Sequence, residues 1–514
     1  MHKIIKEKGQ YIILTIVSIC IIVAVAYWTY GKDSYFVDEL YSYCLANGHY
    51  LPFLPCDNQW KTAQYYLDYL TVMEEGADAG SVFYNQSCDV HPPAYYLVMN
   101  LISSLFPGVF SKWIGLSINI IALTATLILM YFLCKNYIFD SKFAIAVVAV
   151  YGLSTAFYSN LLFIRMYAML TFFIIAILYI HLKAYKQGWE FSIKDMCALG
   201  IVSFLGFLTH YFFITYAFFL YAIAMICMLT QRKIMKMLDY IITLIVSFGA
   251  YVMVWSTVFT HLVGGEQGSG FLSAMFTDQE LQGLKMTFDS VINNLFGKKW
   301  WILLLALVLI AIACGVKRRK VTQYFEGTVY AYLFLPLLAD IIIIANKVSG
   351  TDRYLYPLFP IIVIAVLWGV YGSIKILTNE KVYLAVWGVS ICILVALNNV
   401  NVTPAFYRYS FPYSDTMKQL DGLNCLYVNS GWAKYTANVN EFLAYPNIYL
   451  ANNYDFSWMS QDEIIAQSDR LVVYIDNDYD SNVVLEELFK SSDYQSSSLV
   501  IDGLGYSKIY LVEK

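Results

Sequence analysis

The chain has 514 residues, of which 59% are hydrophobic and only 14% are charged, and its formal net charge is −4. A soluble globule of this length has too little interior to bury so much apolar surface, so the composition excludes an ordinary soluble domain. The weak negative charge and the pI near 5.9 argue against a nucleic-acid partner. We therefore expect a polytopic α-helical membrane protein whose helices contact membrane lipids.

Apolar runs long enough to cross the roughly 30 Å hydrocarbon core of a bilayer recur along the first 400 residues. The first follows the basic leader Met1–Lys3, but its length and the lack of a small-x-small cleavage site predict a retained anchor. Eleven runs are predicted to be transmembrane helices. They are residues 11–30, 113–134, 141–160, 163–182, 196–210, 211–230, 238–260, 300–316, 325–345, 354–374 and 382–398.

The positions of lysine and arginine predict the orientation of these helices, because short cytoplasmic loops are enriched in both residues. With a cytoplasmic N-terminus, 17 of the 33 basic residues fall in the inside loops. This orientation requires that the apolar stretch 92–106 lies along the outer face without crossing the membrane. We therefore predict a juxtamembrane helix there, with Pro92 and Pro93 in its first turn, where a missing N–H costs nothing.

Three pieces are predicted to lie outside the membrane, on its exterior side. Residues 1–399 form the membrane domain itself, within which residues 31–112 are a first exterior loop and residues 261–299 a second. Residues 400–514 form a polar tail. We expect substrate specificity to involve the second loop, where Glu266 and Gln267 are candidates.

The tail has the pattern of a small α/β domain. Strand-like runs at Cys425–Val428, Arg470–Ile475 and Lys508–Val512 alternate with an amphipathic helical run from Asn482 to Lys490. Two roles for this extracytoplasmic domain remain open. It either binds an acceptor or serves as a stabilising cap.

Three of the ten cysteines, Cys44, Cys56 and Cys88, share the first exterior loop. Two alternatives are open for them: a Cys56–Cys88 disulfide, which an oxidising compartment would permit, or three separate thiols. Their spacings do not match a tetrahedral zinc pattern.

Ionisable residues gather at the predicted outer face rather than in the membrane interior, where Asp340 is the one acid expected. The residues at the outer face are Asp38, Glu39, Asp89, His91, Arg165, His210, Asp352 and Arg353. A transporter usually places its polar site near the bilayer midplane, on broken helices. The distribution therefore favours chemistry on a substrate whose head group lies at the membrane surface.

Several of these residues also have a purely structural interpretation. Asp38 and Glu39 begin a predicted helical segment, where adjacent acids point about 100° apart; they either serve a site or stabilise the helix dipole. Asp89 either caps the following helix or serves the site, and the two roles are compatible. Arg165 either extends to the membrane surface from its helix or binds a ligand. His91 stands between an acid and two prolines, which hold it more rigidly than a loop histidine requires.

Five short motifs occur in an order that resembles a known family. They are Asp38-Glu39, Asp89-Val90-His91-Pro92-Pro93-Ala94-Tyr95-Tyr96, Arg165-Met166-Tyr167-Ala168, Thr209-His210-Tyr211 and Arg353-Tyr354-Leu355-Tyr356-Pro357. Together they resemble bacterial members of glycosyltransferase family 39, relatives of the protein O-mannosyltransferases and the lipid A aminoarabinose transferases. The resemblance covers the first 400 residues, and the Asp-x-His-Pro-Pro element is its most specific part.

The resemblance implies a GT-C fold and an enzyme that moves a sugar from a polyprenyl phosphate to an extracytoplasmic glycan, lipid or protein. By the same analogy Asp38 is the catalytic base of an inverting transfer, and Glu39 binds the acceptor or supports Asp38. Positively charged or hydrogen-bonding groups are then needed around the departing phosphate. The residues implied for the donor sugar and phosphate are Asp89, His91, Arg165, His210 and Arg353.

The sequence also departs from the eukaryotic protein mannosyltransferases. Ala94-Tyr95-Tyr96 replaces their Gly-Lys-type continuation, and there is no β-trefoil insert, so the sugar and the acceptor stay open. A divalent metal held by Asp38, Glu39 and Asp89 is an alternative, although arginine and histidine already balance phosphate charge. Two rival functions are a transporter or flippase of polyprenyl-linked glycans and a non-catalytic membrane partner in envelope assembly.

Overall fold

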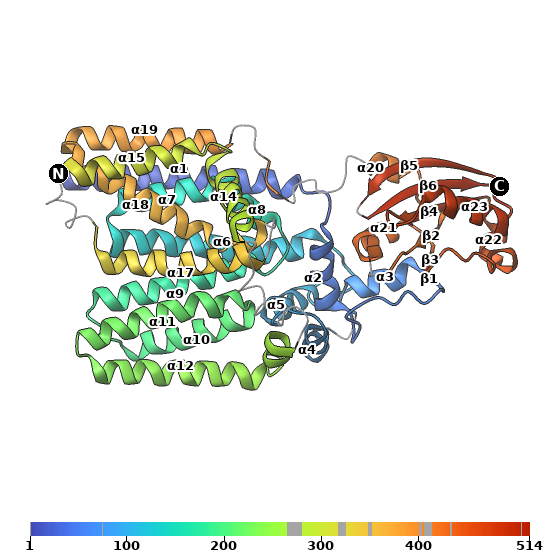
Figure 1. Cartoon of the computed structure of the whole chain (residues 1–514), viewed down its shortest axis with the longest axis horizontal. Helices are drawn as coiled ribbons and strands as arrows, with labels where there is room; N and C mark the ends of the chain where they lie inside the picture. Colours follow the sequence, from blue (N-terminus) through green and yellow to red (C-terminus); the bar gives the residue numbers. More distant parts are fainter. Residues whose placement is uncertain are drawn as a thin grey trace. The chain divides into compact units, whose positions relative to one another are not determined.

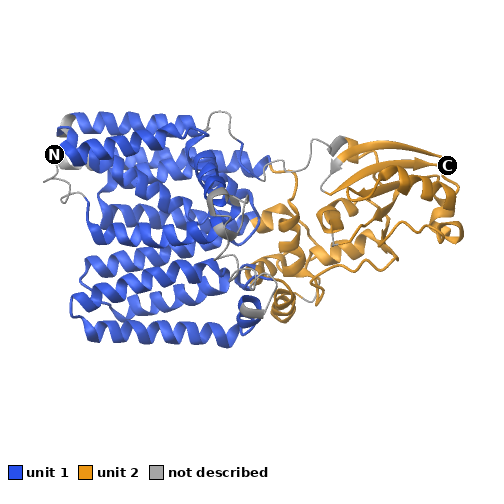
Figure 2. Cartoon of the chain, in the orientation of Figure 1, with its two compact units in different colours: residues 1–31, 90–95, 116–407 blue, residues 32–89, 96–115, 408–514 orange. Residues whose placement is uncertain are grey.

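The computed structural model describes residues 2–514 apart from 74–75, 265–279, 317–324, 348–351, 400–402, 406–413, 432–433 and 505. It divides into two compact units (Figure 2). Unit 1 contains residues 1–31, 90–95 and 116–407, and unit 2 contains residues 32–89, 96–115 and 408–514. Glu266 and Gln267, the predicted specificity residues, lie outside the described residues.

Unit 1 is a bundle of long apolar helices that run side by side (Figure 1). In chain order they are α1 (His2–Tyr30), α6 (Lys112–Leu133), α7 (Ser141–Gly152), α8 (Thr155–Leu162), α9 (Tyr167–Lys186), α10 (Ile193–Thr209), α11 (Phe212–Thr230), α12 (Ile234–Val254), α14 (Glu280–Phe296), α15 (Trp301–Val316), α17 (Gly327–Lys347), α18 (Phe359–Leu377) and α19 (Glu380–Asn399). A short 3-10 turn, η3 (Asp352–Leu355), precedes α18.

All eleven predicted apolar runs overlap helices of the bundle. Seven described helices are long and apolar enough to cross a membrane, and two bent pairs, α7 with α8 and α14 with α15, raise the number to nine. Of the other two predicted runs, α10 has 17 residues and the apolar part of α19 spans Val382–Asn398. The described part of the chain therefore has seven to nine such spans, where the sequence predicts eleven.

The bends have local causes. Between α7 and α8 the chain turns by 56°, and the Ser154 hydroxyl accepts the N–H of Phe157 to cap the new helix. Between α14 and α15 it turns by 89° at Gly297 and Lys298, which both have positive φ. Apolar periodicity does not reveal either break, because the residues on both sides are equally hydrophobic.

Asp340 lies in α17, as predicted for an acid inside the membrane domain. Its side chain is buried, and its Oδ1 accepts a hydrogen bond of 2.6 Å from the Thr215 hydroxyl of α11. A buried polar group requires such a partner, since an unpaired one is costly away from water.

The predicted juxtamembrane segment forms α5 (Ala94–Ser103), whose ten residues are too few to cross a bilayer. Pro92 and Pro93 precede the helix instead of forming its first turn. One interpretation predicted that Asp89 is the N-cap of α5, and this prediction is wrong. Asp89 is the C-cap of α4 (Ala79–Cys88), and its N–H donates to the Gln86 carbonyl.

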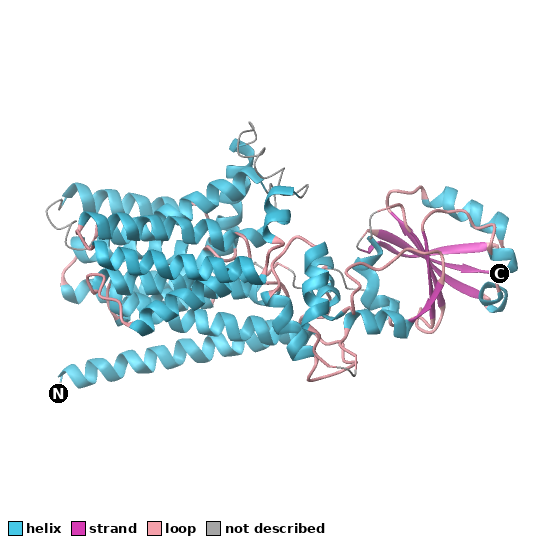
Figure 3. Ribbon diagram, turned by 90° about the horizontal axis from the view of Figure 1, so that it is seen from below, coloured by secondary structure: helices cyan, strands magenta, loops and turns pink. Residues whose placement is uncertain are grey.

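Unit 2 combines helices from the first exterior loop with a six-stranded sheet, shown in magenta in Figure 3. The loop contributes α2 (Val37–Asn47), α3 (Ala63–Leu70), α4 and most of α5. The strands are β1 (Trp60–Thr62), β2 (Asn424–Val428), β3 (Asn447–Ala451), β4 (Arg470–Asp476), β5 (Ser496–Leu504) and β6 (Ser507–Glu513). The helices of the tail are α20 (Ser414–Met417), α21 (Val439–Phe442), α22 (Glu463–Gln467) and α23 (Ser481–Ser491).

The predicted α/β character of the tail is confirmed, since its three strand-like runs are β2, β4 and β6 and its helical run is α23. The strand order is β1-β3-β2-β4-β6-β5, with β3, β2 and β4 parallel and the other pairs antiparallel. The edge strand β1 comes from the first exterior loop, where Trp60 pairs with Tyr449. Trp60 also donates from Nε1 to Asp462 at 2.9 Å, which ties the loop to the tail.

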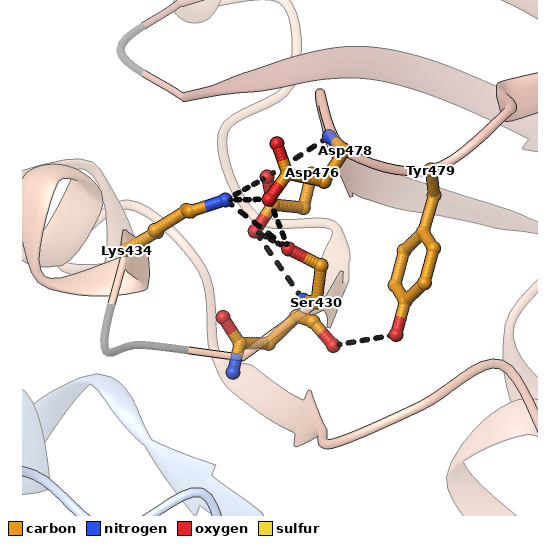
Figure 4. A network of polar contacts seen from close by, with 6 residues as sticks. Ser430, Lys434, Asp476, Asp478 and Tyr479 are labelled. Atoms are coloured by element: carbon orange, nitrogen blue, oxygen red, sulfur yellow. Dashed lines mark hydrogen bonds and ion pairs between the residues drawn. The ribbon is translucent and has the colours of Figure 1, made fainter.

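A polar network joins β2 and β4 at their carboxyl ends (Figure 4). The Ser430 hydroxyl donates to buried Asp476 at 2.7 Å, and the Lys434 ammonium pairs with Asp476 at 3.2 Å and with Asp478. The Tyr479 hydroxyl donates to the Asn429 carbonyl at 3.3 Å. The network satisfies the buried carboxylate of Asp476 and links the chain that follows β2 to the end of β4.

Cys44, Cys56 and Cys88 are all free thiols, so the Cys56–Cys88 disulfide is absent from the structure. The Cys56 thiol instead donates to the Leu450 carbonyl at 3.4 Å. Of the two alternatives, the arrangement therefore agrees with separate thiols.

The predicted exterior position of unit 2 can be tested through Cys88, whose thiol is exposed. In a variant that keeps Cys88 as its one cysteine, an impermeant maleimide added to intact cells is expected to label the protein. A matched variant that keeps only Cys425, which is buried in β2, is expected to stay unlabelled. Labelling of Cys88 that requires permeabilised membranes would contradict the predicted orientation.

Candidate active site

The predicted site residues fall into two groups of opposite charge, one in each unit. Unit 2 holds the acids Asp38, Glu39 and Asp89, and unit 1 holds four basic residues. The basic residues are His91, Arg165, His210 and Arg353. The boundary between the units falls directly after Asp89, and two residues of extended chain span at most about 7 Å. The chain itself therefore keeps Asp89 near His91.

Glu39 lies in the first turn of α2 and is fully buried together with Lys32. Its Oε2 accepts from the Lys32 ammonium at 2.9 Å and from the N–H of Phe36, the residue before the helix, at 2.7 Å. An acid in this position satisfies a free N–H and complements the helix dipole. Of its two predicted roles, support of Asp38 agrees better with this geometry than contact with an acceptor.

Asp38 is half-buried next to Glu39, and Asp89 is half-buried at the end of α4. Both carboxylates influence the pKa of the Tyr41 hydroxyl. Burial raises the pKa of Tyr41, a hydrogen bond with Thr436 opposes this shift, and the negative charges of Asp38 and Asp89 raise the pKa further. The fold thus brings the two acids within electrostatic reach of Tyr41. The sequence motifs omit this residue, although its position three residues after Asp38 on a helix puts it on nearly the same face.

The acids do not fit the alternative of a divalent metal. Within the described residues, the structure contains no group of three or more His, Cys, Asp or Glu side chains that would hold one. The carboxylate of Glu39 is turned to an ammonium and a backbone N–H, whereas metals such as Mg²⁺ and Ca²⁺ need several convergent oxygens.

His210 is the most informative residue of the basic group. It follows α10 directly, and its Nδ1 accepts the N–H of Phe212 at 3.1 Å, so the neutral ring carries its proton on Nε2. The side chain is 5% exposed, and Nε2 has no hydrogen-bond partner among the described residues. Buried donors are normally satisfied, so this N–H has the position of a ligand contact.

Positive charge surrounds this ring. Burial lowers the pKa of His210 well below its ordinary value, and electrostatic repulsion from His91 and Arg165 lowers it further. The His91 and His210 rings are 5.7 Å apart between centroids. Arg165 is only 6% exposed and stands before α9, which begins at Tyr167 and not at Phe163. Its burial contradicts the interpretation that it extends to the membrane surface.

Arg353 joins the same group through aromatic rings. Its guanidinium carbon lies 5.4 Å from the centre of the Tyr354 ring, a cation–π contact. The Tyr354 ring is 5.8 Å from that of Tyr167, which in turn is 5.6 Å from His210. Tyr167 and Tyr354 occur in the sequence motifs, but neither was predicted to frame the site. Their closeness to an arginine in the sequence, with Tyr167 two residues after Arg165 and Tyr354 directly after Arg353, was the available signal.

We call these four residues, His91, Arg165, His210 and Arg353, the basic cluster. Guanidinium groups keep their charge when buried and can donate two parallel hydrogen bonds to one oxyanion. Together with the Nε2–H of His210, which has no partner in the described part of the chain, they provide groups suited to an anion such as a phosphate.

No family model matches the sequence, and no curated protein matches it. Among solved structures, ArnT from Cupriavidus metallidurans in the apo state is similar, with a TM-score of 0.54 and 12% identity over 99% of this chain and 98% of that chain. ArnT from the same organism bound to undecaprenyl phosphate has a TM-score of 0.50 and 12% identity over 96% of this chain and 97% of that chain. The chain therefore has the GT-C fold that its motifs predict. Membership of family 39 stays a prediction.

Replacing Lys32 by methionine tests the importance of the buried ion pair. Lys32→Met leaves the Glu39 charge buried without its cation, so the free energy of unfolding is expected to fall by about 3–5 kcal/mol. Thermal unfolding of the purified protein in detergent measures this loss. The double variant Lys32→Met/Glu39→Met, which removes both charges, is expected to regain most of it. A Lys32→Met variant as stable as the wild type would contradict the assignment.

The lowered pKa of His210 predicts a pH-dependent stability. The unfolded ring binds a proton below about pH 6.5, whereas the folded ring resists protonation, so the contribution of His210 to stability is present above that pH and is lost as the pH falls. His210→Gln is therefore expected to flatten the decrease of the melting temperature between about pH 7.5 and 5. Identical pH profiles for wild type and variant would show that His210 is not held neutral.

Proposed function

We propose that this protein is a membrane glycosyltransferase that moves a sugar from a polyprenyl-phosphate donor to an extracytoplasmic acceptor. The basic cluster is the observation that carries this proposal. It places the buried guanidinium of Arg165 close to His210, whose Nε2–H has no partner among the described residues. Arg353 adds a second guanidinium, which ring contacts through Tyr354 and Tyr167 link to the same histidine. The fold that this chain shares with ArnT adds support for this proposal, because one structure of ArnT is bound to undecaprenyl phosphate.

In this proposal the basic cluster binds the head group of the donor. Arg165 and Arg353 donate to phosphate oxygens, and His210 donates from Nε2 without adding charge. These groups stabilise the negative charge that develops as the lipid phosphate leaves. His91 and Asp89, joined by a single residue, contact the sugar, and Asp89 orients His91. The apolar helices of unit 1 accommodate the long apolar chain of the donor.

Asp38 is the proposed catalytic base. As the acceptor hydroxyl attacks the anomeric carbon, a new C–O bond forms and the hydroxyl proton passes to the Asp38 carboxylate. The bond between the anomeric carbon and the phosphate oxygen breaks, and its electron pair leaves with the lipid phosphate. Attack from the face opposite the phosphate inverts the anomeric centre. Glu39 acts as a positioning residue, because its contacts with Lys32 and Phe36 hold the turn that carries Asp38.

The proposal includes a location. The basic inside loops favour a cytoplasmic N-terminus, with the active site and the α/β domain on the extracytoplasmic side. A donor head group at the outer membrane surface agrees with the position of the site residues in the sequence, at the ends of apolar helices.

Purified full-length protein with labelled polyprenyl-phosphate sugars and candidate acceptors tests the reaction. Asp38→Asn keeps the size of the side chain but removes the base, and is expected to slow donor consumption by about 100-fold or more. The matched control Asp33→Asn changes an exposed acid five residues earlier and is expected to keep wild-type activity.

Either of two results would contradict the proposal: no donor is consumed under any condition, or Asp38→Asn transfers sugar normally. Translocation of a lipid-linked sugar that survives Asp38→Asn would instead support a transporter. Normal cellular function without Asp38, Asp89 and His91 would support a non-catalytic partner.

A further inference from the structure

A second polar site lies within unit 2, and none of the residues assigned above lines it. It is a cavity of about 520 Å³ formed by the end of α2, the chain between α3 and α4, the start of α4, and α5. Its polar lining consists of Asn47, His49, Asp78, Ser81 and Asn100. The volume lies within the roughly 300–1,000 Å³ of typical small-molecule sites.

Hydrogen bonds between separate elements hold the walls of this cavity. Asn100 donates from Nδ2 to the Ala46 carbonyl at 2.8 Å, and its Oδ1 accepts the N–H of Asp78 at 2.9 Å. The Ser81 hydroxyl donates to the Gly48 carbonyl at 2.9 Å and accepts the N–H of Tyr50 at 2.8 Å. Because buried networks of this kind are rigid, the cavity is preformed.

Two features leave hydrogen-bonding capacity for a ligand. Asn47 is 7% exposed and donates from Nδ2 to the Leu70 carbonyl, but its Oδ1 has no hydrogen-bond partner among the described residues. His49 and Asp78 are 67% and 38% exposed, and Nδ1 and Oδ2 are 3.3 Å apart. The cavity thus combines an amide, an imidazole and a carboxylate, which together donate to and accept from hydroxyl groups.

Exposed aromatic rings stand beside this polar lining. The Tyr50 ring is 5.5 Å from that of Tyr84 and 5.0 Å from that of His49, and both tyrosines are exposed. Tyr50 has φ of +48°, a left-handed conformation that is uncommon for a bulky residue and that persists only where its surroundings enforce it. The hydrogen bond from its N–H to Ser81 supplies such a constraint. Tyrosine rings of this kind present apolar faces to a partly apolar ligand.

We infer that this cavity is a saccharide-binding subsite that holds the glycan part of the acceptor. The inference rests on the proposed transferase function and narrows its acceptor to a carbohydrate-bearing molecule. Hydroxyl groups of the sugar donate to Asp78 and Asn47 and accept from His49, while Tyr50 and Tyr84 pack against the apolar face of the ring. The Asp78 carboxylate disfavours an anionic ligand. A peptide acceptor fits the cavity less well, because the described lining has no strand edge with which an extended chain would pair.

Two alanines provide a matched test. Ala77 and Ala79 are both exposed, but only Ala77 lines the cavity, so Ala77→Trp fills it and Ala79→Trp does not. The probes are methyl glucoside, methyl galactoside, methyl mannoside and N-acetylglucosamine, each added to the full-length protein in lipid nanodiscs. Saturation-transfer NMR is expected to detect binding of at least one of them. The signal is expected to fall at least fivefold in Ala77→Trp and in the exposed-site variant His49→Ala, and to be unchanged in Ala79→Trp.

The inference is overturned if none of the four probes binds, if Ala77→Trp and His49→Ala give the wild-type signal, or if a serine- and threonine-rich peptide binds at this cavity in place of the sugars. Undecaprenyl-phosphate binding and donor consumption are measured in the same variants. These two measurements distinguish a failure of the saccharide subsite from a failure of the proposed transferase function. Neither donor binding nor donor consumption requires Ala77, so both are expected to persist when saccharide binding is lost. Saccharide binding without any donor consumption would support the saccharide subsite but contradict the proposed transferase activity.

Discussion

The buried ion pair between Lys32 and Glu39 is the interaction on which the acidic residues of unit 2 depend. Neither side chain has any exposed surface, so each charge would be strongly destabilising without the other. The Glu39 carboxylate also accepts the N–H of Phe36 and thereby sets where α2 begins. Asp38 is the preceding residue of the same turn, and its direction follows from that start. The Lys32–Glu39 pair therefore positions Asp38, and neither of its side chains takes a direct part in the proposed chemistry.

The basic cluster of unit 1 follows a different physical rule. Arg165 remains charged when buried because of its very high intrinsic pKa, whereas burial and neighbouring positive charge keep His210 neutral. A neutral ring adds a hydrogen-bond donor without adding to the repulsion among cations. This combination suits a ligand whose negative charge increases during a reaction. Asp89 and His91 are separated by one residue in the sequence, so this short motif supplies both a carboxylate and an imidazole.

Much of the fold was predictable because it follows from local composition. Each predicted apolar run overlaps a helix, and the strands of the tail follow from alternating β-branched and aromatic residues. The predictions that were wrong concern capping and burial. Asp89 ends α4 and does not begin α5, and Arg165 is enclosed although an arginine near a helix end commonly reaches the membrane surface. Both depend on what surrounds the residue, and that environment comes from distant segments.

The amino-acid sequence by itself determined the class of the protein, the apolar helices and the set of ionisable residues, because hydrophobic length and charge are properties of each segment alone. The motif residues could also be named from it. Only the tertiary structure decided that Lys32 and Glu39 meet as a fully buried pair, that Asp89 lies within reach of Tyr41, and that Trp60 adds a strand to the sheet of the tail. Each depends on packing against segments distant in the chain, which no local pattern encodes.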